Sequence, residues 1–394
     1  MSDPIVRIAA RGDGVTANGR HAAFAVPGDI LLADGSVLAG PHHQVPPCRH
    51  FPECGGCQLQ HADDLAYREY LAFRVRGALA QHRLETEIRL PHLSPPRSRR
   101  RASLRAFRMG KQVPIGFNAE KSHHIIDMRE CHILRPELFA LVSPLRGLLA
   151  QLLPQRRPAE VQLTLADRGV DILLRGVEVE GLTAIEALTQ FCERHKLARL
   201  SIDRGFGAET HYEPVPATIS LSGIPVSLPH GAFLQATEEG EAALVAAARE
   251  AAGSAETVAD LFAGLGTFTF GSGGKVYAAE AARDAIAALY AAARKAGRAI
   301  AAEHRDLYRR PLDDAELARF DAVILDPPRS GAEEQVRNLA GATVPKIAYI
   351  SCNPATFARD AAILVGGGYR LEWVQPVGQF RWSTHVELAA CFSR

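Results

Sequence analysis

The C-terminal part of the chain alternates short apolar runs with alanine-rich stretches. After residue 236 the apolar runs predict five strands, at 258–262, 276–279, 299–302, 322–325 and 347–350. Between them lie helical stretches such as 283–296. This alternation is typical of a doubly wound α/β domain with a mainly parallel sheet. No helix separates the last two apolar segments, 369–374 and 385–392, so we expect an antiparallel hairpin at the sheet edge.

The earlier part of the chain has a different pattern. In the first 46 residues, short apolar runs alternate with glycine-bearing turns, which predicts a small β-domain. Residues 101–106 alternate with period two, so a half-buried hairpin with a basic outer face is expected there. Further strands at 160–165, 170–175, 198–202 and 218–221, with a helix near 183–195, predict a central α+β domain. We therefore divide the chain into three domains, at 1–46, 47–230 and 231–394.

Length and charge narrow the picture further. At 394 residues the chain is too long for one ordinary core, which agrees with several domains. The net charge of +1 says little about partners, but its distribution is informative. The segment 91–116 has no acidic residue and carries a run of cations: Arg97, Arg99, Arg100, Arg101, Arg105, Arg108 and Lys111. This arginine stripe suits a phosphate backbone, and a solvated surface is the alternative.

The cysteines predict a metal site. The sequence shows no apolar membrane span and no secretory leader, so we expect a cytoplasmic protein in which disulfides are rare. Cys48, Cys54 and Cys57 lie within ten residues, and Cys131 follows 74 residues after Cys57. Four thiolates hold either tetrahedral zinc or an iron-sulfur cluster, and the spacing alone leaves both open.

A glycine-rich turn follows the first predicted strand of the C-terminal domain. In open α/β sheets ligands bind beyond the carboxyl ends of the strands. There Asp260-Leu-Phe-Ala-Gly264-Leu-Gly266 ends the first strand, and Glu280 ends the next one, placed to accept bonds from ribose hydroxyls. The pyrophosphate-binding glycine pattern is missing, which favours a nucleoside cofactor such as S-adenosylmethionine. Asp306 either contacts the adenine or simply starts a helix.

Two further motifs follow later strands. Asp326-Pro-Pro-Arg329 presents charged side chains on a stiff loop, and Ser351-Cys352-Asn353-Pro354 lies before a predicted helix. A helix N-terminus favours thiolate, so Cys352 is a candidate nucleophile. By contrast, Cys192 and Cys391 fall within a helix and a strand and suit a buried structural role. Glu387 is the candidate base.

Taken together these motifs resemble the RNA uracil-5-methyltransferase family over nearly the whole chain from Cys48. The resemblance rests on Cys48-x5-Cys54-x2-Cys57, Cys131, Phe233-x-Gln235, Asp260-Leu-Phe-x-Gly264-x-Gly266, Asp326-Pro-Pro-Arg329, Ser351-Cys352-Asn353-Pro354 and His385-Val-Glu387. Within the family the chain is most similar to the iron-sulfur 23S rRNA enzymes. Ala263 and Thr267 depart from residues common in the family's glycine loop, and this puts a cofactor contact by Thr267 in doubt.

The resemblance implies a function and a set of roles. A Cys352 thiolate would add to carbon 6 of a uracil, which makes carbon 5 nucleophilic, and Glu387 would remove the carbon 5 proton after methyl transfer. S-adenosylmethionine would be contacted by Gln235, Phe262, Glu280 and Asp326. The four cysteines Cys48, Cys54, Cys57 and Cys131 would hold a [4Fe-4S] cluster. The partner would be RNA, 23S rRNA first, and the first 46 residues resemble the small RNA-binding barrel called TRAM.

Three alternatives remain at this point. The first is a uracil-5-methyltransferase that acts on tRNA. The second is an adenine amino-methyltransferase, which has a related acidic-Pro-Pro loop but an aromatic residue where Arg329 stands and no use for Cys352. The third is a non-catalytic iron-sulfur RNA-binding protein. No obligate protein partner is inferred.

Overall fold

The computed structural model describes residues 3–394, so the range 1–46 begins two residues outside the described part. Its first element is a small five-stranded antiparallel sheet with the order β3-β2-β1-β4-β5. Ile5, Ala22, Ala25 and Leu31 form a core of its own. The strands are β1 (Asp3–Ile8), β2 (Gly14–Thr16), β3 (His21–Ala22), β4 (Ile30–Leu31) and β5 (Val37–Leu38).

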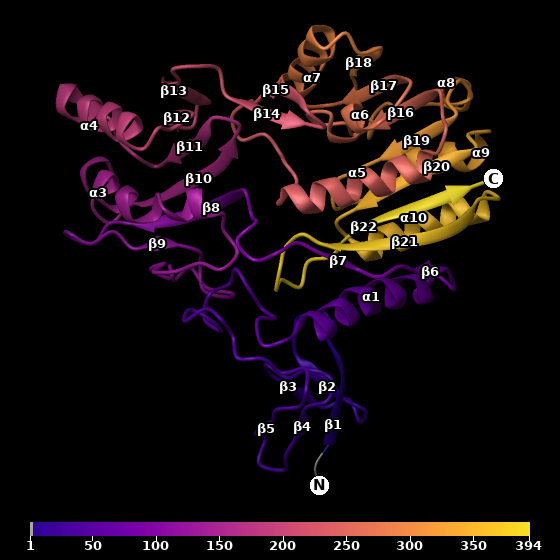
Figure 1. Cartoon of the computed structure of the whole chain (residues 1–394), viewed down its shortest axis with the longest axis horizontal. Coiled ribbons are helices and arrows are strands. Elements are labelled where there is room, and N and C mark those ends of the chain that lie inside the picture. Colours follow the sequence, from indigo (N-terminus) through magenta and orange to yellow (C-terminus); the bar gives the residue numbers. More distant parts are fainter. Residues whose placement is uncertain (1–2) are drawn as a thin grey trace.

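The central part contains a six-stranded mixed sheet with the order β13-β12-β11-β10-β8-β9 (Figure 1). In β8, Ala102, Leu104 and Ala106 are buried while Ser103 and Arg105 are exposed, which confirms the predicted alternation. The strands are β8 (Arg101–Phe107), β9 (Ile115–Gly116), β10 (Pro158–Ala166), β11 (Gly169–Arg175), β12 (Arg199–Asp203) and β13 (Ala208–Tyr212). The helices are α2 (Pro136–Phe139), α3 (Val142–Leu152) and α4 (Gly181–Arg194), and a hairpin of β14 (Thr218–Leu221) and β15 (Ile224–Ser227) follows.

The C-terminal sheet has the order β18-β17-β16-β19-β20-β22-β21-β6, with β7 also paired to β21. Strands β16 to β20 are parallel and β22 is antiparallel to its neighbours, which confirms the predicted α/β methyltransferase-type sheet. The strands are β16 (Thr257–Leu261), β17 (Lys275–Glu280), β18 (Ile300–His304), β19 (Ala322–Leu325), β20 (Lys346–Ser351), β21 (Arg370–Gly378) and β22 (Glu387–Ser393). The helices are α5 (Glu238–Ala252), α6 (Thr267–Gly271), α7 (Arg283–Lys295), α8 (Asp314–Leu317), α9 (Glu333–Gly341) and α10 (Pro354–Gly366).

Both faces of this sheet are covered. Alternate residues of β19 point to opposite sides, so Val323 and Leu325 join one core while Ala322 and Ile324 join another. Helix α5 packs against the second face, and α10 packs against the first. Within residues 3–394, no helix combines the length and the apolar character that crossing a membrane requires.

The predicted sheet edge is wrong, because an earlier segment extends the sheet past β21. Strands β6 (Glu87–Ile88) and β7 (His92–Leu93) pair with β21 in parallel. The preceding helix α1 (Asp64–Gln81) buries Tyr67, Leu71 and Val75 in the core that also contains α10. Residues 64–93 therefore pack on the C-terminal sheet, although we assigned them to the range 47–230. The three-range division itself stays a prediction.

Candidate active site

Cys352 lies between the end of β20 and the start of α10. Asn353 caps this helix, since its side chain accepts a hydrogen bond from the backbone N–H of Ala355 at 3.1 Å. Pro354 suits the first helical position, where no backbone donor is needed. The sequence Ser-Cys-Asn-Pro thus stops the strand and starts the helix, which leaves the half-buried Cys352 at the carboxyl edge of the sheet.

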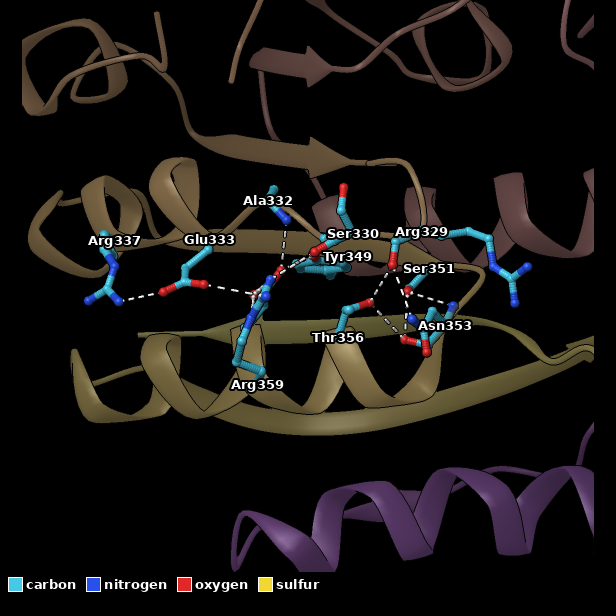
Figure 2. Close-up of polar contacts among 12 residues, drawn as sticks. Arg329, Ser330, Ala332, Glu333, Arg337, Tyr349, Ser351, Asn353, Thr356 and Arg359 are labelled. Atoms are coloured by element: carbon cyan, nitrogen blue, oxygen red, sulfur yellow. Dashed lines mark hydrogen bonds and ion pairs between the residues drawn. The ribbon is translucent and has the colours of Figure 1, made fainter. Parts of the chain in front are cut away.

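The loop that follows β19 is fastened to the start of α10 (Figure 2). Asn353 Nδ2 and Thr356 Oγ1 both donate to the carbonyl oxygen of Arg329 at 3.1 Å. Arg359 donates to the carbonyl of Ser330 at 3.0 Å. These bonds use only the backbone of Arg329, and its guanidinium points away from them (Figure 2). The Asp326-Pro-Pro-Arg329 loop is therefore held in a fixed relation to Cys352.

Cys352 and Glu387 line the same cleft, whose volume is about 910 Å³. Glu387 begins β22 and is only 6% exposed. Arg329 and Phe233 line the same walls, and Phe233 is exposed. We call this hollow the catalytic cleft, because it brings together the candidate nucleophile and the candidate base.

Electrostatics in the catalytic cleft favour neutral forms of its acids. Burial raises the pKa of Glu387 from 4.5 to about 7. A hydrogen bond with the Gln379 side chain and the charges of Arg101 and Arg329 lower this pKa but do not cancel the effect of burial. Burial, followed by the charge of Glu387, raises the pKa of Asp326 well above its usual range. Burial and these two carboxyls also raise the pKa of Cys352 to about 11. In the site without ligands, burial and these carboxyls therefore favour the thiol form of Cys352, against the expected effect of the helix N-terminus.

Two buried amides lie beside these acids: Gln235, a predicted cofactor position, and Gln379, which sequence reasoning missed. Gln235 donates from Nε2 to Asp326 Oδ2 at 3.4 Å and accepts from Gln379 Nε2 at 2.7 Å. Gln379 is 1% exposed and also opposes the rise in the pKa of Glu387. The signal was its place directly after a strand, but that strand was expected to end at 374 and in fact continues to Gly378.

The predicted cofactor positions surround the glycine-rich turn after β16. Phe262 has a positive φ of 66°, a conformation that costs energy for any residue except glycine, and its ring lies 5.5 Å from that of Tyr308. Glu280 accepts from the backbone N–H of Gly264 at 2.9 Å. At Gly266 a Cβ would stand 2.8 Å from the Phe270 ring, so only glycine fits the turn. Gln235 is connected to this edge of the sheet by its hydrogen bond to Asp326. The cofactor roles of Gln235, Phe262, Glu280 and Asp326 stay predictions.

Two neighbouring residues have local structural roles. Asp306 accepts from the backbone N–H of Tyr308 at 3.0 Å and thereby closes a turn. The expectation that it starts a helix is wrong, because the next helix, α8, begins at Asp314, and its contact with adenine stays a prediction. Thr267 is the first residue of α6. Cys192 and Cys391 are buried in cores, as expected.

The four clustered cysteines line one hollow. Cys48, Cys54, Cys57 and Cys131 are free thiols around the same cavity. Among residues 3–394, no three His, Cys, Asp or Glu side chains stand close enough to hold a metal ion. A single tetrahedral zinc with bonds of about 2.3 Å needs four sulfurs nearly in contact. An iron-sulfur cluster contains several metal atoms, so its cysteines stand farther apart, and an all-thiol donor set suits it.

The arginine stripe does not form one exposed face. Arg100 is 1% exposed and pairs with Glu241 at 2.5 Å, so the expectation that it meets phosphates is wrong. Arg101 places its guanidinium 4.4 Å from the centre of the Phe233 ring. Arg99 lines the catalytic cleft, and Arg105 is exposed but pairs with Glu160 at 3.0 Å. The cations of this segment are divided between the core, the cleft and the outer surface.

Comparison with known proteins identifies relatives of this chain. A family model described as tRNA (uracil-5-)-methyltransferase matches residues 230–394. An uncharacterized RNA methyltransferase of Zymomonas mobilis is 49% identical over 99% of both chains. The 23S rRNA (uracil(1939)-C(5))-methyltransferase RlmD of Chromohalobacter salexigens is 33% identical over 91% of this chain and 78% of its own length.

A solved structure is similar over the whole fold. The Pyrococcus abyssi tRNA (uracil-54, C5)-methyltransferase, in complex with S-adenosyl-L-homocysteine, covers 100% of both chains with a TM-score of 0.76. Its sequence identity is 22%, so this likeness concerns the fold.

Proposed function

Because the chain belongs to the S-adenosylmethionine-dependent RNA uracil-5-methyltransferase family, we propose that it methylates carbon 5 of a uridine in RNA with Cys352 as the covalent nucleophile. The observation that carries this proposal is the joint position of Cys352 and Glu387 in the catalytic cleft. Neither an adenine amino-methyltransferase nor a non-catalytic RNA-binding protein requires a thiol and a buried carboxyl there.

Each residue has one task in the proposed reaction. The Cys352 sulfur forms a bond to carbon 6, and the electron pair of the ring double bond makes carbon 5 nucleophilic. S-adenosylmethionine, when bound, supplies the electrophilic methyl group, and Gln235, Phe262, Glu280 and Asp326 would hold it. Glu387 then accepts the carbon 5 proton. The ring double bond re-forms and the carbon 6–sulfur bond breaks, which returns Cys352 as thiolate.

The raised pKa values fit this division of labour. Cys352 must lose its proton before it adds, and the nearby Arg329 opposes the rise in its pKa. Binding of a cation next to Glu387 and Asp326 lowers the pKa of all three acidic groups, because opposite charge favours their ionised forms. A base whose pKa lies close to neutral both accepts and releases a proton readily near pH 7.

We also propose that Cys48, Cys54, Cys57 and Cys131 hold a [4Fe-4S] cluster. Their common cavity and the all-thiol donor set support this proposal, and the resemblance to the iron-sulfur enzymes favours it over zinc. Methyl transfer from a sulfonium to an enolate moves no unpaired electron, so the cluster's role is structural: it joins the segment near Cys131 to the loop at 48–57.

The proposed substrate is 23S rRNA. RlmD, whose name states that substrate, is similar to this chain over most of both lengths. The tRNA enzyme of Pyrococcus abyssi shares the fold at lower identity, so tRNA is the second candidate. Mapping 5-methyluridine in 23S rRNA and tRNA from cells with and without this protein distinguishes the two.

The test of the mechanism separates addition from release. Unmodified RNA from such cells is incubated with S-adenosylmethionine that carries a labelled methyl group. Cys352→Ala is expected to transfer no label, while Glu387→Gln is expected to accumulate a labelled covalent protein–RNA adduct. Cys391→Ala, at a buried structural thiol, is the matched control and should turn over normally. Normal turnover of Cys352→Ala would refute the covalent mechanism, and normal release by Glu387→Gln would assign the base elsewhere.

A further inference from the structure

Three neighbouring surface hollows share lining residues between Cys352 and the β8–β9 hairpin. The catalytic cleft shares part of its wall with a hollow of about 540 Å³, through Gly55, Phe117, Glu120 and Lys121. That hollow shares Asn118 and His123 with a third one, of about 1260 Å³. We call the third hollow the lateral groove. It is lined by residues of the β8–β9 hairpin and of α3.

The lateral groove is basic. Four of its lining residues carry permanent positive charge, and they come from separate segments: Arg105, Lys111, Arg129 and Arg146. Asp127 is the one carboxylate among its lining residues, all of which belong to the described chain. It pairs with Arg129 at 2.5 Å and with Arg146 at 2.8 Å. The lining residues therefore carry a net charge of about three positive units. Glu160, which is not a lining residue, pairs with Arg105.

The cations differ in what they do for the fold. Arg146 also donates to the carbonyl of Met128 at 2.6 Å, so it fixes the loop that forms one wall. Lys111 is exposed at the hairpin turn, and no carboxylate within residues 3–394 pairs with it. Arg129 is exposed as well. Lys111 and Arg129 are thus available to a ligand. If Arg129 leaves Asp127 to contact a ligand, Asp127 still pairs with Arg146.

Apolar side chains lie among these charges. Phe107 is half-buried and Met109 is 52% exposed, and both line the lateral groove. A basic surface interrupted by flat or flexible apolar groups suits single-stranded nucleic acid, because phosphates contact the cations while bases stack on the apolar faces. An acidic peptide would use the charges but not the stacking faces.

We propose that the lateral groove binds the single-stranded RNA next to the target uridine while that uridine occupies the catalytic cleft. This inference rests on the proposed function, since it takes the base at Cys352 as one end of the path. A base delivered to an enclosed site leaves its duplex or loop, and the neighbouring nucleotides then need a surface of their own. The three neighbouring hollows provide one, from Cys352 past Lys121 to Lys111.

The test compares RNA length and charge. The probes are fluorescein-labelled oligouridylates of 4 and 16 nucleotides, and the variant is Lys111→Ala/Arg129→Ala. For single strands each phosphate contact contributes a salt slope of about −0.7, which corresponds to about fivefold in affinity at 0.1 M salt. The double variant should therefore bind the 16-mer about 25-fold more weakly, with a correspondingly shallower salt slope. Binding of the 4-mer, which occupies the cleft alone, should change less than about twofold.

The matched control is Arg294→Ala/Lys295→Ala at the end of α7, which removes the same charge at a distance from the β8–β9 hairpin (Figure 1). It should bind the 16-mer like the wild type. Equal binding by the wild type and the groove variant, or equal losses in both double variants, would overturn the proposal. Methyl transfer by the wild-type protein to unmodified 23S rRNA is measured in parallel. Its absence would refute the proposed function, whereas the 16-mer comparison judges the groove by itself.

Discussion

Replacing Glu387 by Gln should make the protein more stable at alkaline pH although it removes the proposed base. The Glu387 side chain is 6% exposed, and burial raises its pKa from 4.5 to about 7. That difference corresponds to about 3 kcal/mol between the protonated and ionised forms. A buried glutamine is uncharged at every pH, so it avoids this cost.

The sign follows from linkage. A carboxyl whose pKa is raised in the folded state favours folding fully below its unfolded pKa, near 4.5, and loses that contribution as the pH rises through about 7. The stability difference between Glu387→Gln and the wild type should therefore change by about 3 kcal/mol between pH 4.5 and 8.5, in favour of the variant. Above pH 8 the difference should be constant.

The assay is urea unfolding of both proteins without ligands at closely spaced pH values. Glu334→Gln, at an exposed position of α9, is the control and should show no comparable pH-dependent difference. If the difference between Glu387→Gln and the wild type is the same at pH 4.5 and 8.5, Glu387 is not an isolated buried acid and the account of the cleft's electrostatics is wrong.

Three further predictions follow from the same structure. Ionisation of Glu387 near pH 7 should favour S-adenosylmethionine over S-adenosylhomocysteine by up to about tenfold in affinity, because only S-adenosylmethionine carries a positive sulfonium. Calorimetric titrations at several pH values measure both affinities, and a ratio that does not change with pH would contradict this prediction. Arg100→Met should lower the free energy of unfolding by about 3–5 kcal/mol, because it leaves Glu241 buried and unpaired, and Arg100→Met/Glu241→Leu should recover most of the loss in urea melts. Cys131→Ser should lose iron and sulfide by elemental analysis while Cys192→Ser keeps them; stoichiometric zinc without sulfide in the wild type would refute the cluster.

The sequence predicts the C-terminal sheet well because its signals are local. The strand expected at 322–325 has the same bounds in the structure, and the others differ by one or two residues at their ends. The inner strands β16, β19 and β20 are largely apolar and buried on both sides, as is usual for parallel sheets, whereas the edge strand β18 is only partly buried. Cys352 lies directly after β20, and Glu387 is the first residue of β22. These positions, together with the family resemblance, allowed the two residues to be proposed as partners.

Features that depend on contacts between distant segments were missed. The pairing of β6 and β7 with β21 joins residues 87–93 to 373–378, and two-residue strands have no readable pattern. The burial of Arg100 depends on Glu241, which is 141 residues away. A run of arginines looks the same in sequence whether its members face solvent or a carboxylate in the core, so only the fold separates Arg100 from Arg105.

The family model matches the segment that holds the proposed chemistry and not the segments that line the lateral groove. Residues 230–394, which the model matches, contain Cys352, Glu387 and the glycine-rich turn. More than half of the residues that line the catalytic cleft come from earlier segments, among them Arg11, Arg99 and Lys121. The lateral groove is built wholly from residues before 160. A methyl donor and a uracil ring require the same groups in any RNA, whereas the path of the flanking strand differs from one RNA to another. If the lateral groove binds the flanking strand as proposed, substitutions before residue 230 should change which RNA is methylated without changing the chemistry proposed for Cys352.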